Sequence, residues 1–400
     1  MRDVVIVGAG PAGSYMARCL AEEGLDVLLL EEHAEAGEGV ICSGIIGREA
    51  YERFDLPAEA TVGALQRVRF HSPSGKVVDY DADGPLATIV SRKKFDAGLA
   101  RRAVRAGAEL RTGSRVRDVR AGPEGVRLEW RRDGESRELR ARLCVLATGF
   151  GSGLVRRCGF GGPRERIQAA QALMPFRDQG SAGIYLGSRF APRGFGWSVP
   201  IGDGLARIGV VTDRQAPGYL RRILNRPDVR PHRAAAGEPA AIEACPIPVG
   251  TLDETVADRL MVVGEAAGQV KTTTQGGIYY GLLCAETAAR VAIGAFRAGD
   301  LSRAALAPYD RRWRERLGAE LRLGLLLREF YSELSDRQVD RLFDLARIEG
   351  VLPMIERKVR FDWHGPVIRS VLNKGFLGAA VRSMLGLAPP TLAEGFIRRP

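Results

Sequence analysis

Hydrophobic and polar positions follow clear periods at the start of the chain. An apolar run at Val4–Val7 precedes a glycine-rich turn and a helix-like pattern that continues to Leu20. A second apolar run, Val27–Leu30, ends at Glu31. Short apolar runs bounded by turn residues indicate buried strands, and a period of about 3.6 residues indicates a helix. This order predicts a strand, a turn, a helix and a second strand.

The rest of the chain alternates between strand-like and helix-like patterns. Three short runs at about 114–120, 126–132 and 136–141 predict a β-meander, and a buried strand follows at Leu143–Ala147. Between 165 and 248 the runs are short and separated by turn residues, which predicts a second, mostly antiparallel sheet. Most of the last hundred residues carry a helical pattern. Together these patterns predict an α/β fold with a C-terminal helical region.

The first turn carries candidate chemistry, because its glycines have the spacing of a dinucleotide-binding fingerprint. Gly8 permits the tight turn, Gly10 lets a pyrophosphate approach the backbone, and Gly13 lets the helix pack closely on the strand. The pyrophosphate is then held by the helix N-terminus. Glu31 ends the second strand, where a carboxylate accepts hydrogen bonds from ribose hydroxyls. The acid favours FAD or NAD over NADP.

Composition limits the possible partners. The chain has 400 residues, of which 45% are hydrophobic and 27% charged, as in ordinary folded proteins. Its formal net charge is +11, and 53 of the 59 basic residues are arginine, which indicates an anionic partner or surface only weakly. The basic residues are dispersed and no nucleic-acid-binding motif accompanies them, so we expect no nucleic acid partner.

Cysteine and histidine positions argue against a metal site. The six cysteines, at 19, 42, 144, 158, 245 and 284, show no C-x-x-C spacing, and the four histidines, at 33, 71, 232 and 364, show no spacing for a metal or a triad. We therefore expect no metal and assign the histidines no role. A reducing, cytoplasmic compartment fits the scattered thiols. No apolar run reaches the length of a membrane span, and no signal peptide is evident.

The chain resembles the FAD-dependent geranylgeranyl reductase family, within the p-hydroxybenzoate-hydroxylase-like flavoproteins, over nearly its whole length. The resemblance rests on the fingerprint and on six further motifs: Cys42-Ser43-Gly44, Arg92-x-x-Phe95-Asp96, Ala147-Thr148-Gly149, Gly194-Phe195-Gly196-Trp197-Ser198-Val199-Pro200, Gly264-Glu265-Ala266-Ala267-Gly268 and Gly276-Gly277-Ile278. The motif around Trp197 and the position of Cys42 are the features that point to this family.

The resemblance implies FAD as the cofactor and a set of residues that bind it. These residues are Gly8, Gly10, Ala12, Gly13, Glu31, Glu32, Cys42, Ser43, Gly44, Arg92, Thr148, Gly149, Gly264, Glu265, Gly276, Gly277 and Ile278. It also implies three functional regions. A discontinuous, Rossmann-like FAD-binding domain that includes the β-meander would comprise 1–60, 85–164 and 249–300; a substrate-binding β domain would comprise 61–84 and 165–248; and the helical region would comprise 301–400.

The implied reaction is the reduction of prenyl carbon–carbon double bonds by hydride transfer from flavin N5. Gly276 and Gly277, at a helix entry, would direct N–H groups at the flavin N1/C2 edge, where charge accumulates on reduction. Cys42 would face the substrate as a proton donor or a shaping residue, although buried cysteines are more often inert. Phe195, Trp197 and Pro200 would line an apolar tunnel for the prenyl tail, with Trp197 as a rigid wall.

Three residues depart from the family pattern in one stretch. Glu265 stands where the family usually has aspartate, Thr272 where it has proline, and Gln275 where it has glycine. Gln275 places a side chain where backbone usually approaches the flavin ring, so these departures mark either specialisation or loss of activity. Lys271 begins the stretch and is expected to be solvated. Tyr279 and Tyr280 follow it as alternative proton donors or as helix packing residues.

Other functions remain compatible with the sequence. A flavin-dependent monooxygenase or halogenase has the same fold, although the chain lacks the first tryptophan of the halogenase motif Trp-x-Trp-x-Ile-Pro. A non-catalytic flavin or prenyl-lipid binding protein is a third alternative. No second dinucleotide fingerprint is present, so electrons would arrive from transiently docked NAD(P)H or from a separate redox carrier.

The C-terminal segment, residues 355–400, combines basic and apolar positions. It holds eight basic residues against three acids, a net charge of +5. Such a segment suits reversible binding to anionic membrane headgroups, and packing as an ordinary helix with a solvated basic face explains it equally well. The sequence therefore predicts a cytoplasmic protein with possible peripheral contact to a membrane surface.

Overall fold

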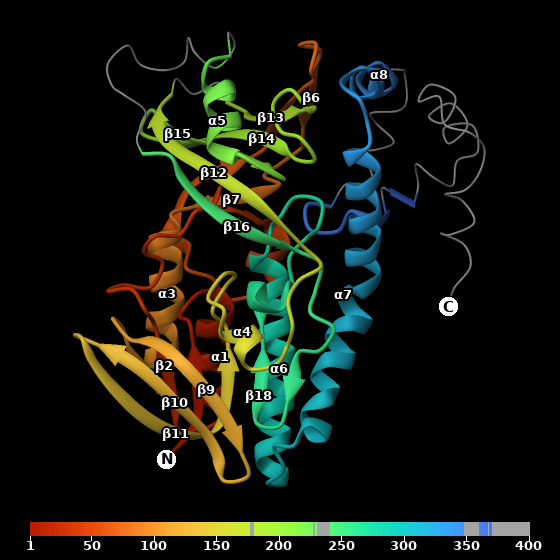
Figure 1. Cartoon of the computed structure of the whole chain (residues 1–400). Helices are drawn as coiled ribbons and strands as arrows, with labels where there is room; N and C mark the ends of the chain where they lie inside the picture. Colours follow the sequence, from red (N-terminus) through yellow and green to blue (C-terminus); the bar gives the residue numbers. More distant parts are fainter. Residues whose placement is uncertain (177–179, 227–228, 230–240, 348–359, 367, 370–400) are drawn as a thin grey trace. The chain divides into compact units, whose positions relative to one another are not determined.

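The computed structural model describes the chain except for residues 177–179, 227–228, 230–240, 348–359, 367 and 370–400 (Figure 1). The chain divides into two compact units. The first comprises Met1–Ala64, Thr88–Gln168 and Ala244–Leu325, and the second comprises Leu65–Ala87, Ala169–Glu243 and Leu326–Pro400. Among the described helices, none combines the length and apolar character that crossing a bilayer requires.

The first unit is built on a mainly parallel sheet. Its strands lie in the order β17 (Val256–Ala257), β18 (Leu260–Val262), β11 (Glu135–Leu146), β1 (Arg2–Val7), β2 (Val27–Leu30) and β8 (Glu109–Arg111). β1 is central and pairs in parallel with both β2 and β11. Such strands are buried on both faces, which explains their continuous apolar sequences.

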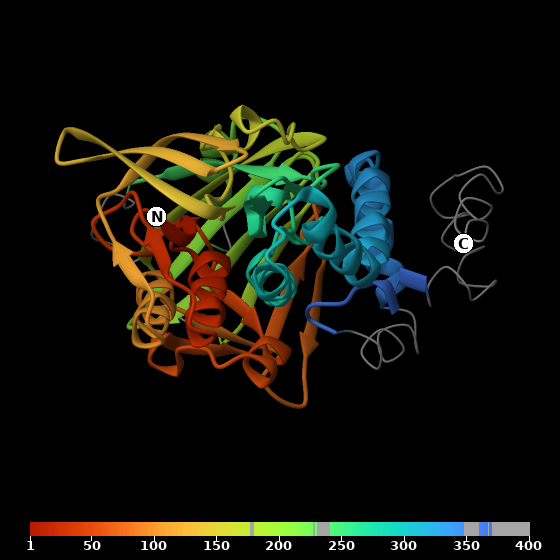
Figure 2. The ribbon, with the colours of Figure 1, turned by 90° about the horizontal axis from the view of Figure 1, so that it is seen from below.

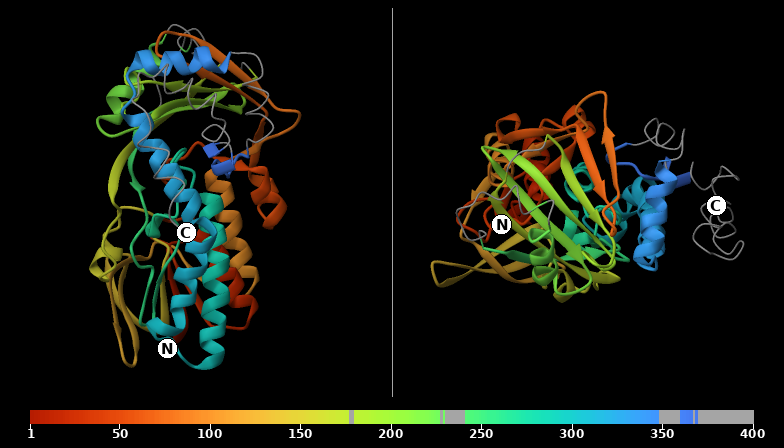
Figure 3. Two further views of the ribbon diagram at one scale, coloured as in Figure 1. Left: turned by 90° about the vertical axis from the view of Figure 1, so that its right-hand side faces the viewer. Right: turned by 90° about the horizontal axis from the view of Figure 1, so that it is seen from above.

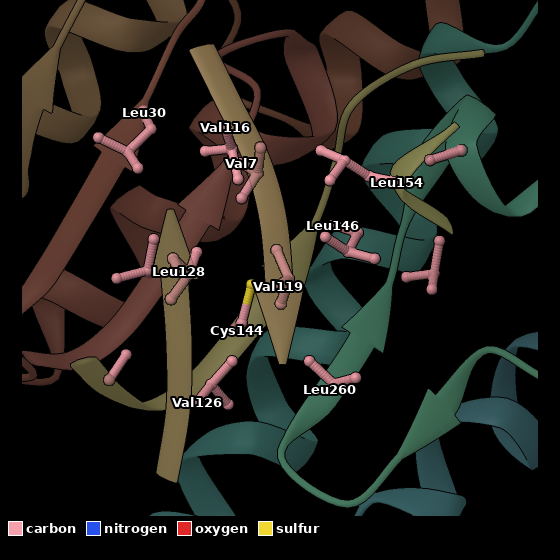
Figure 4. Close-up of a cluster of buried hydrophobic side chains, with 14 of the residues drawn as sticks. Val7, Leu30, Val116, Val119, Val126, Leu128, Cys144, Leu146, Leu154 and Leu260 are labelled. Atoms are coloured by element: carbon pink, nitrogen blue, oxygen red, sulfur yellow. The ribbon is translucent and has the colours of Figure 1, made fainter. Parts of the chain in front are cut away.

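The predicted β-meander covers one face of this sheet. β9 (Arg115–Gly122) and β10 (Gly125–Arg132) pair antiparallel with each other, and β10 pairs with the long strand β11. Because side chains alternate along a strand, Val5 and Val7 of β1 and Leu28 and Leu30 of β2 point to this face. They form a buried cluster with meander side chains, among them Trp130. Figure 4 shows the meander residues Val116, Val119, Val126 and Leu128 of this cluster.

Helices cover the opposite face, as Figure 2 shows for α1 (Pro11–Glu22) and α3 (Arg92–Arg105). Pro11 begins α1, a position that suits proline because its missing N–H needs no partner there. Ser91 caps α3 by accepting a hydrogen bond from the Lys94 N–H. α6 (Ile278–Ala298) ends at Gly299, whose φ of 70° terminates the helix.

α7 (Arg303–Ser332) runs beside α6 for part of its length (Figures 1 and 3). Its residues up to Leu325 belong to the first unit. Trp313 donates a hydrogen bond to the Thr255 hydroxyl, and Tyr309 donates to the carbonyl of Val262. The remaining elements of this unit are short: α2 (Arg48–Arg53), α4 (Leu154–Arg157), the 3-10 helices η1 (Ala58–Ala60) and η3 (Gly264–Ala267), and a small sheet of β3 (Ile45–Gly47), β7 (Ala87–Val90) and β4 (Thr61–Leu65).

The second unit contains the predicted antiparallel sheet. Its strands lie in the order β12 (Glu165–Pro175), β15 (Leu205–Thr212), β14 (Phe195–Gly202), β13 (Ala182–Leu186), β5 (Arg67–His71) and β6 (Val77–Asp81). β13 and β5 pair in parallel, whereas β14 pairs antiparallel with both β13 and β15, and β5 pairs antiparallel with β6. The boundary with the first unit falls inside β12 and next to the start of β16 (Glu243–Val249).

Two helices pack on this second sheet. α5 (Ala216–Leu224) covers one face through Leu220 and Ile223. α8 (Asp336–Ala346) lies against β6, where Val339 and Phe343 join an apolar cluster (Figure 3). The predicted fold class, an α/β dinucleotide domain with a β-meander, a second sheet and C-terminal helices, is confirmed.

Candidate functional site

The three fingerprint glycines are required for different reasons. A Cβ on Gly8, whose φ is +103°, would lie 2.4 Å from the carbonyl oxygen of Ala147. A Cβ on Gly13 would lie 2.0 Å from the carbonyl oxygen of Gly8. By contrast, a Cβ on Gly10 meets nothing within 4 Å. Gly8 and Gly13 are therefore needed for packing within the protein, whereas Gly10 borders open space.

That open space lies at the N-terminus of α1. Among the described residues, the N–H groups of Gly10, Ala12 and Gly13 have no hydrogen-bond acceptor. Exposed N–H groups and the positive end of the helix dipole favour an anion at this position. The geometry fits the pyrophosphate of a dinucleotide.

Glu31 is fixed at the end of β2, beside the glycine turn. The Ala9 N–H donates to its Oε2 at 2.9 Å, and the His33 N–H donates to its Oε1 at 3.0 Å. The His33 Nδ1 lies 2.8 Å from the same Oε1. His33, to which the sequence assigned no role, thus orients the acid. Glu32 instead forms an ion pair with Arg115 at 3.2 Å and is half exposed.

Arg92, at the start of α3, lies in a buried charged cluster. Its Nε and Nη2 bond the two carboxylate oxygens of Asp96 at 2.9 and 2.7 Å. The Asp96 side chain is 1% exposed and the Arg92 side chain 14%. Burial opposes the charge of Arg92, but Asp96, together with Cys42, outweighs this effect and raises the arginine pKa. The arginine is therefore held in one orientation with its charge retained.

Cys42 interacts electrostatically with the Arg92 guanidinium and contributes to its raised pKa. Its sulfur also accepts the Gly44 N–H at 3.4 Å, which folds the Cys42–Gly44 motif, with Ser43 between, into a tight turn. Glu265 also interacts electrostatically with Arg92. Burial raises the pKa of Glu265, and Arg92 opposes that shift. Two of the sequence motifs therefore converge on Arg92.

The carboxyl ends of three parallel strands meet at this site. β1 ends at the Gly8 turn, β11 at Thr148-Gly149 and β18 at Gly264-Glu265. A Cβ on Gly149 would lie 3.7 Å from the Glu265 Oε2, and one on Gly264 would lie 3.0 Å from the Ala12 Cβ. Cofactors in open α/β sheets bind at such strand ends. The structure therefore brings together the fingerprint turn, Thr148-Gly149 and Gly264-Glu265.

The loop before α6 contains two of the three departures from the family pattern. Gln275 has a φ of +60°, the left-handed region that favours glycine. Its Nε2 donates to the Thr272 carbonyl at 3.1 Å, and the Thr272 hydroxyl donates to the Leu321 carbonyl of α7 at 3.2 Å. A Cβ on Gly324 would lie 2.5 Å from that hydroxyl oxygen, so this glycine provides the space for Thr272. Thr272 and Gln275 form one connected arrangement.

The entry of α6 presents unpaired N–H groups. Those of Gly276, Gly277 and Ile278 have no acceptor within the part of the chain that the structure describes. Tyr279 and Tyr280, which follow directly, are both buried, and the Tyr279 hydroxyl donates to Glu49. Burial, followed by the Glu49 interaction, raises the Tyr279 pKa above its ordinary range. Packing therefore accounts for this tyrosine better than proton donation does.

The expectation that Lys271 is solvated is wrong. Lys271 is only 6% exposed, and its side chain folds back over the loop toward Gly276. A lysine in a polar stretch reads as a surface residue, and only the tertiary arrangement shows its burial.

The candidate substrate residues lie on the sheet of the second unit. The rings of Phe195 and Trp197 are 6.1 Å apart between centroids on one face of β14. A Cβ on Gly209, directly opposite Trp197, would lie 2.2 Å from the indole ring, so this glycine makes room for it. Pro200 pairs with Ala206, which contributes to the core beneath α5. Pro200 thus lies on the opposite face, and the three residues do not share one surface as the sequence suggested.

Comparisons with known proteins point to the same fold and the same cofactor. A family model described as FAD binding domain matches residues 1–179. The digeranylgeranylglycerophospholipid reductase 2 of Methanopyrus kandleri is 31% identical over 370 residues, covering 88% of this chain and 92% of that protein. The corresponding protein of Methanothrix thermoacetophila is 32% identical over 371 residues, covering 88% and 93%.

Solved structures give the same picture. A geranylgeranyl bacteriochlorophyll reductase-like protein from Thermoplasma acidophilum superimposes with a TM-score of 0.83 at 25% identity, covering 96% of this chain and 99% of that one. The halogenase PltM in complex with FAD gives a TM-score of 0.68 at 15% identity, covering 96% and 85%. The second likeness shows a shared fold alone.

Proposed function

Because the chain belongs to the FAD-dependent geranylgeranyl reductase family, we propose that it reduces carbon–carbon double bonds of a prenyl lipid. It is an FAD-dependent oxidoreductase. The observation that carries the proposal is the convergence of the fingerprint turn, Arg92, Cys42 and the α6 entry within one unit. Bound FAD supplies the hydride, and the protein positions the cofactor and moves a proton.

In this proposal each part of the site has a separate task. Glu31, oriented by the Ala9 and His33 N–H groups, accepts the ribose hydroxyls. The N-terminus of α1 holds the pyrophosphate. The N–H groups of Gly276 and Gly277 stabilise negative charge that develops on the flavin during reduction, since preorganised donors need no rearrangement.

Cys42 is the proposed proton donor. A thiol that gives up its proton leaves a thiolate, and the neighbouring Arg92 cation stabilises that charge. Asp96 holds the guanidinium in place on its other side. Arg92 therefore serves the proposed reaction by orienting both the cysteine and the cofactor.

The functional domains are proposed to follow the boundaries expected from the sequence. The first compact unit contains most of 1–60, 85–164 and 249–300, which supports their assignment to FAD binding. The second sheet supports a substrate role for 61–84 and 165–248, with Phe195 and Trp197 as the apolar surface that receives a prenyl chain. Residues 301–400 are proposed as the remaining region, and its described helices are α7 and α8. The electron donor is NAD(P)H or a separate carrier, because the sequence contains one fingerprint only.

The direct test is anaerobic turnover. Protein reduced without oxygen and mixed with a digeranylgeranyl lipid should return to the oxidised yellow spectrum, and mass analysis should show the lipid heavier by two hydrogens per reduced bond. A Cys42→Ala variant should bind FAD normally and reduce the lipid much more slowly, by about 10² to 10⁴-fold for loss of a general acid. Reduced flavin that persists with the lipid unchanged would overturn the proposal.

Membrane contact through residues 355–400 is part of the same proposal. This segment lies outside the described residues except for 360–366 and 368–369. We expect the protein to sediment with anionic vesicles at low salt and to be released at high salt, because screening weakens the attraction of a net +5 segment to the headgroups. Sedimentation with neutral vesicles is the control. Absence of binding at low salt would leave the segment with a packing role alone.

We also propose that Thr272 and Gln275 are specialisations and not signs of decay. The Gln275 side chain donates a hydrogen bond to the Thr272 carbonyl, and the Thr272 hydroxyl donates one to α7. The triple reversion Glu265→Asp, Thr272→Pro and Gln275→Gly should leave FAD bound and lower the single-turnover rate with a prenyl lipid. Stability should fall by about 1 kcal/mol: glycine at φ +60° removes about 1 kcal/mol of strain, and the two lost hydrogen bonds, from Thr272 and from Gln275, cost about 1 kcal/mol each. A faster reaction with tighter FAD binding would indicate decay instead.

A further inference from the structure

Lys271 is a buried lysine at the start of the loop before α6. Its backbone N–H donates to the Gly276 carbonyl at 3.1 Å, which closes the loop. A Cβ on Gly276 would lie 2.7 Å from the lysine Cε and 3.2 Å from Nζ. The side chain therefore occupies the space that any larger residue at 276 would fill, and its ammonium lies beside the α6 entry.

This position is already suited to negative charge. The N–H groups of Gly276, Gly277 and Ile278 have no acceptor among the described residues, and α6 is 21 residues long, so its dipole is fully developed. An ammonium is a compact point charge, and its field is screened less inside a protein than in water. The Lys271 ammonium and the N-terminus of α6 therefore both contribute positive potential at the same place.

We propose that Lys271 supplies a fixed positive charge at this helix entry and stabilises the anionic form of reduced FAD. The inference rests on the proposed function, because it requires the flavin at the Gly276–Gly277 end of the site. Lys271 is a positioning residue in this account: it acts on the charge of the cofactor and transfers no proton. It also explains why Gly276 is small, since the lysine crosses over it.

Sulfite provides a test that is independent of prenyl turnover. Its sulfur lone pair forms a bond to flavin N5 and leaves a negative charge on the pyrimidine part of the ring, so the sulfite dissociation constant reports how well the protein stabilises that charge. In FAD-loaded protein, Lys271→Met should weaken sulfite binding at least tenfold. The same factor corresponds to a two-electron midpoint potential about 30 mV lower.

Two matched variants separate charge from structure. Lys271→Arg keeps the cation and should stay close to wild type in both measurements. Lys94→Met removes the same charge from an exposed position of α3 and should also behave like wild type. A Lys271→Met protein that holds FAD with wild-type sulfite affinity and potential would overturn the inference.

The remaining outcomes are also decisive. If Lys271→Met does not hold FAD, Lys271→Gln is measured by the same criterion, because it keeps a polar end inside the loop. If neither neutral variant folds or holds FAD, the lysine has a structural role and the inference fails. A colourless wild type would instead overturn the proposed function. A wild-type protein that binds FAD but does not reduce prenyl lipids would also overturn the proposed function. In that case the sulfite comparison would still decide the role of Lys271.

Discussion

A Gly10→Val variant is expected to fold normally and to be colourless. The backbone at Gly10 has φ −69° and ψ −179°, an extended conformation that valine adopts without strain. No protein atom lies within 4 Å of the position that a Cβ would occupy. The valine side chain would instead enter the space assigned to the pyrophosphate, so FAD affinity should fall beyond detection while the unfolding midpoint of the apoprotein stays unchanged.

Gly13→Ala is the matched control, because it adds one methyl group in the same turn. That methyl would lie 2.0 Å from the Gly8 carbonyl oxygen and 3.0 Å from the Ala147 Cβ, so α1 must shift. Overpacking of this kind costs about 1–3 kcal/mol. We therefore expect Gly13→Ala to lower the unfolding midpoint as well as FAD affinity. A Gly10→Val protein that retains FAD with wild-type affinity would show that the pyrophosphate lies elsewhere.

An Asp96→Ala variant is expected to lose about 3–5 kcal/mol of unfolding free energy, because it leaves the buried Arg92 charge without its partner. The bidentate geometry and the 1% exposure of Asp96 place this pair well inside the protein. Urea denaturation followed by circular dichroism measures the loss. FAD affinity should fall too, since Arg92 would no longer be held toward Cys42 and the cofactor.

Asp79→Ala offers the comparison at the surface. Asp79 also pairs with an arginine through two bonds, at 2.7 and 3.1 Å, but the side chains are 37% and 47% exposed. Exposed pairs contribute about 0–1 kcal/mol. Equal losses for the two variants would mean that burial of the Arg92–Asp96 pair has no energetic consequence.

Local rules explain which parts of this site were predictable. The glycine fingerprint was predictable, because Gly8 and Gly13 are constrained by each other and by Ala147. Ala147 follows a neighbouring strand, and the motif Thr148-Gly149 marks the end of that strand in the sequence. The position of Asp96 follows from the i, i+4 spacing of Arg92 on one helix face. Side chains alternate along a strand, so Pro200 and Phe195, five positions apart, lie on opposite faces of β14. Their different faces could therefore have been predicted from the sequence.

Other features depend on contacts that no local pattern encodes. Lys271 is buried because Gly276 leaves room for its side chain, and Thr272 is fixed because α7 presents the Leu321 carbonyl and the small Gly324. The role of His33 depends on the exact direction of the Glu31 carboxylate. From their polarity alone, each of these residues would be predicted to lie in solvent and to have no role in the site.

The attachment of the loop before α6 to α7 has a consequence for synthesis of the protein. The fingerprint leaves the ribosome first, but Glu265, the loop and the Leu321 carbonyl that anchors Thr272 follow only after more than two hundred further residues. A nascent chain that ends before β18 therefore carries the fingerprint without the half of the site that is proposed to surround the flavin ring, and one that ends before α7 carries the loop without its Leu321 anchor. Pairing such distant segments is slow, so the edge of β11 that pairs with β18 stays open until β18 has been made.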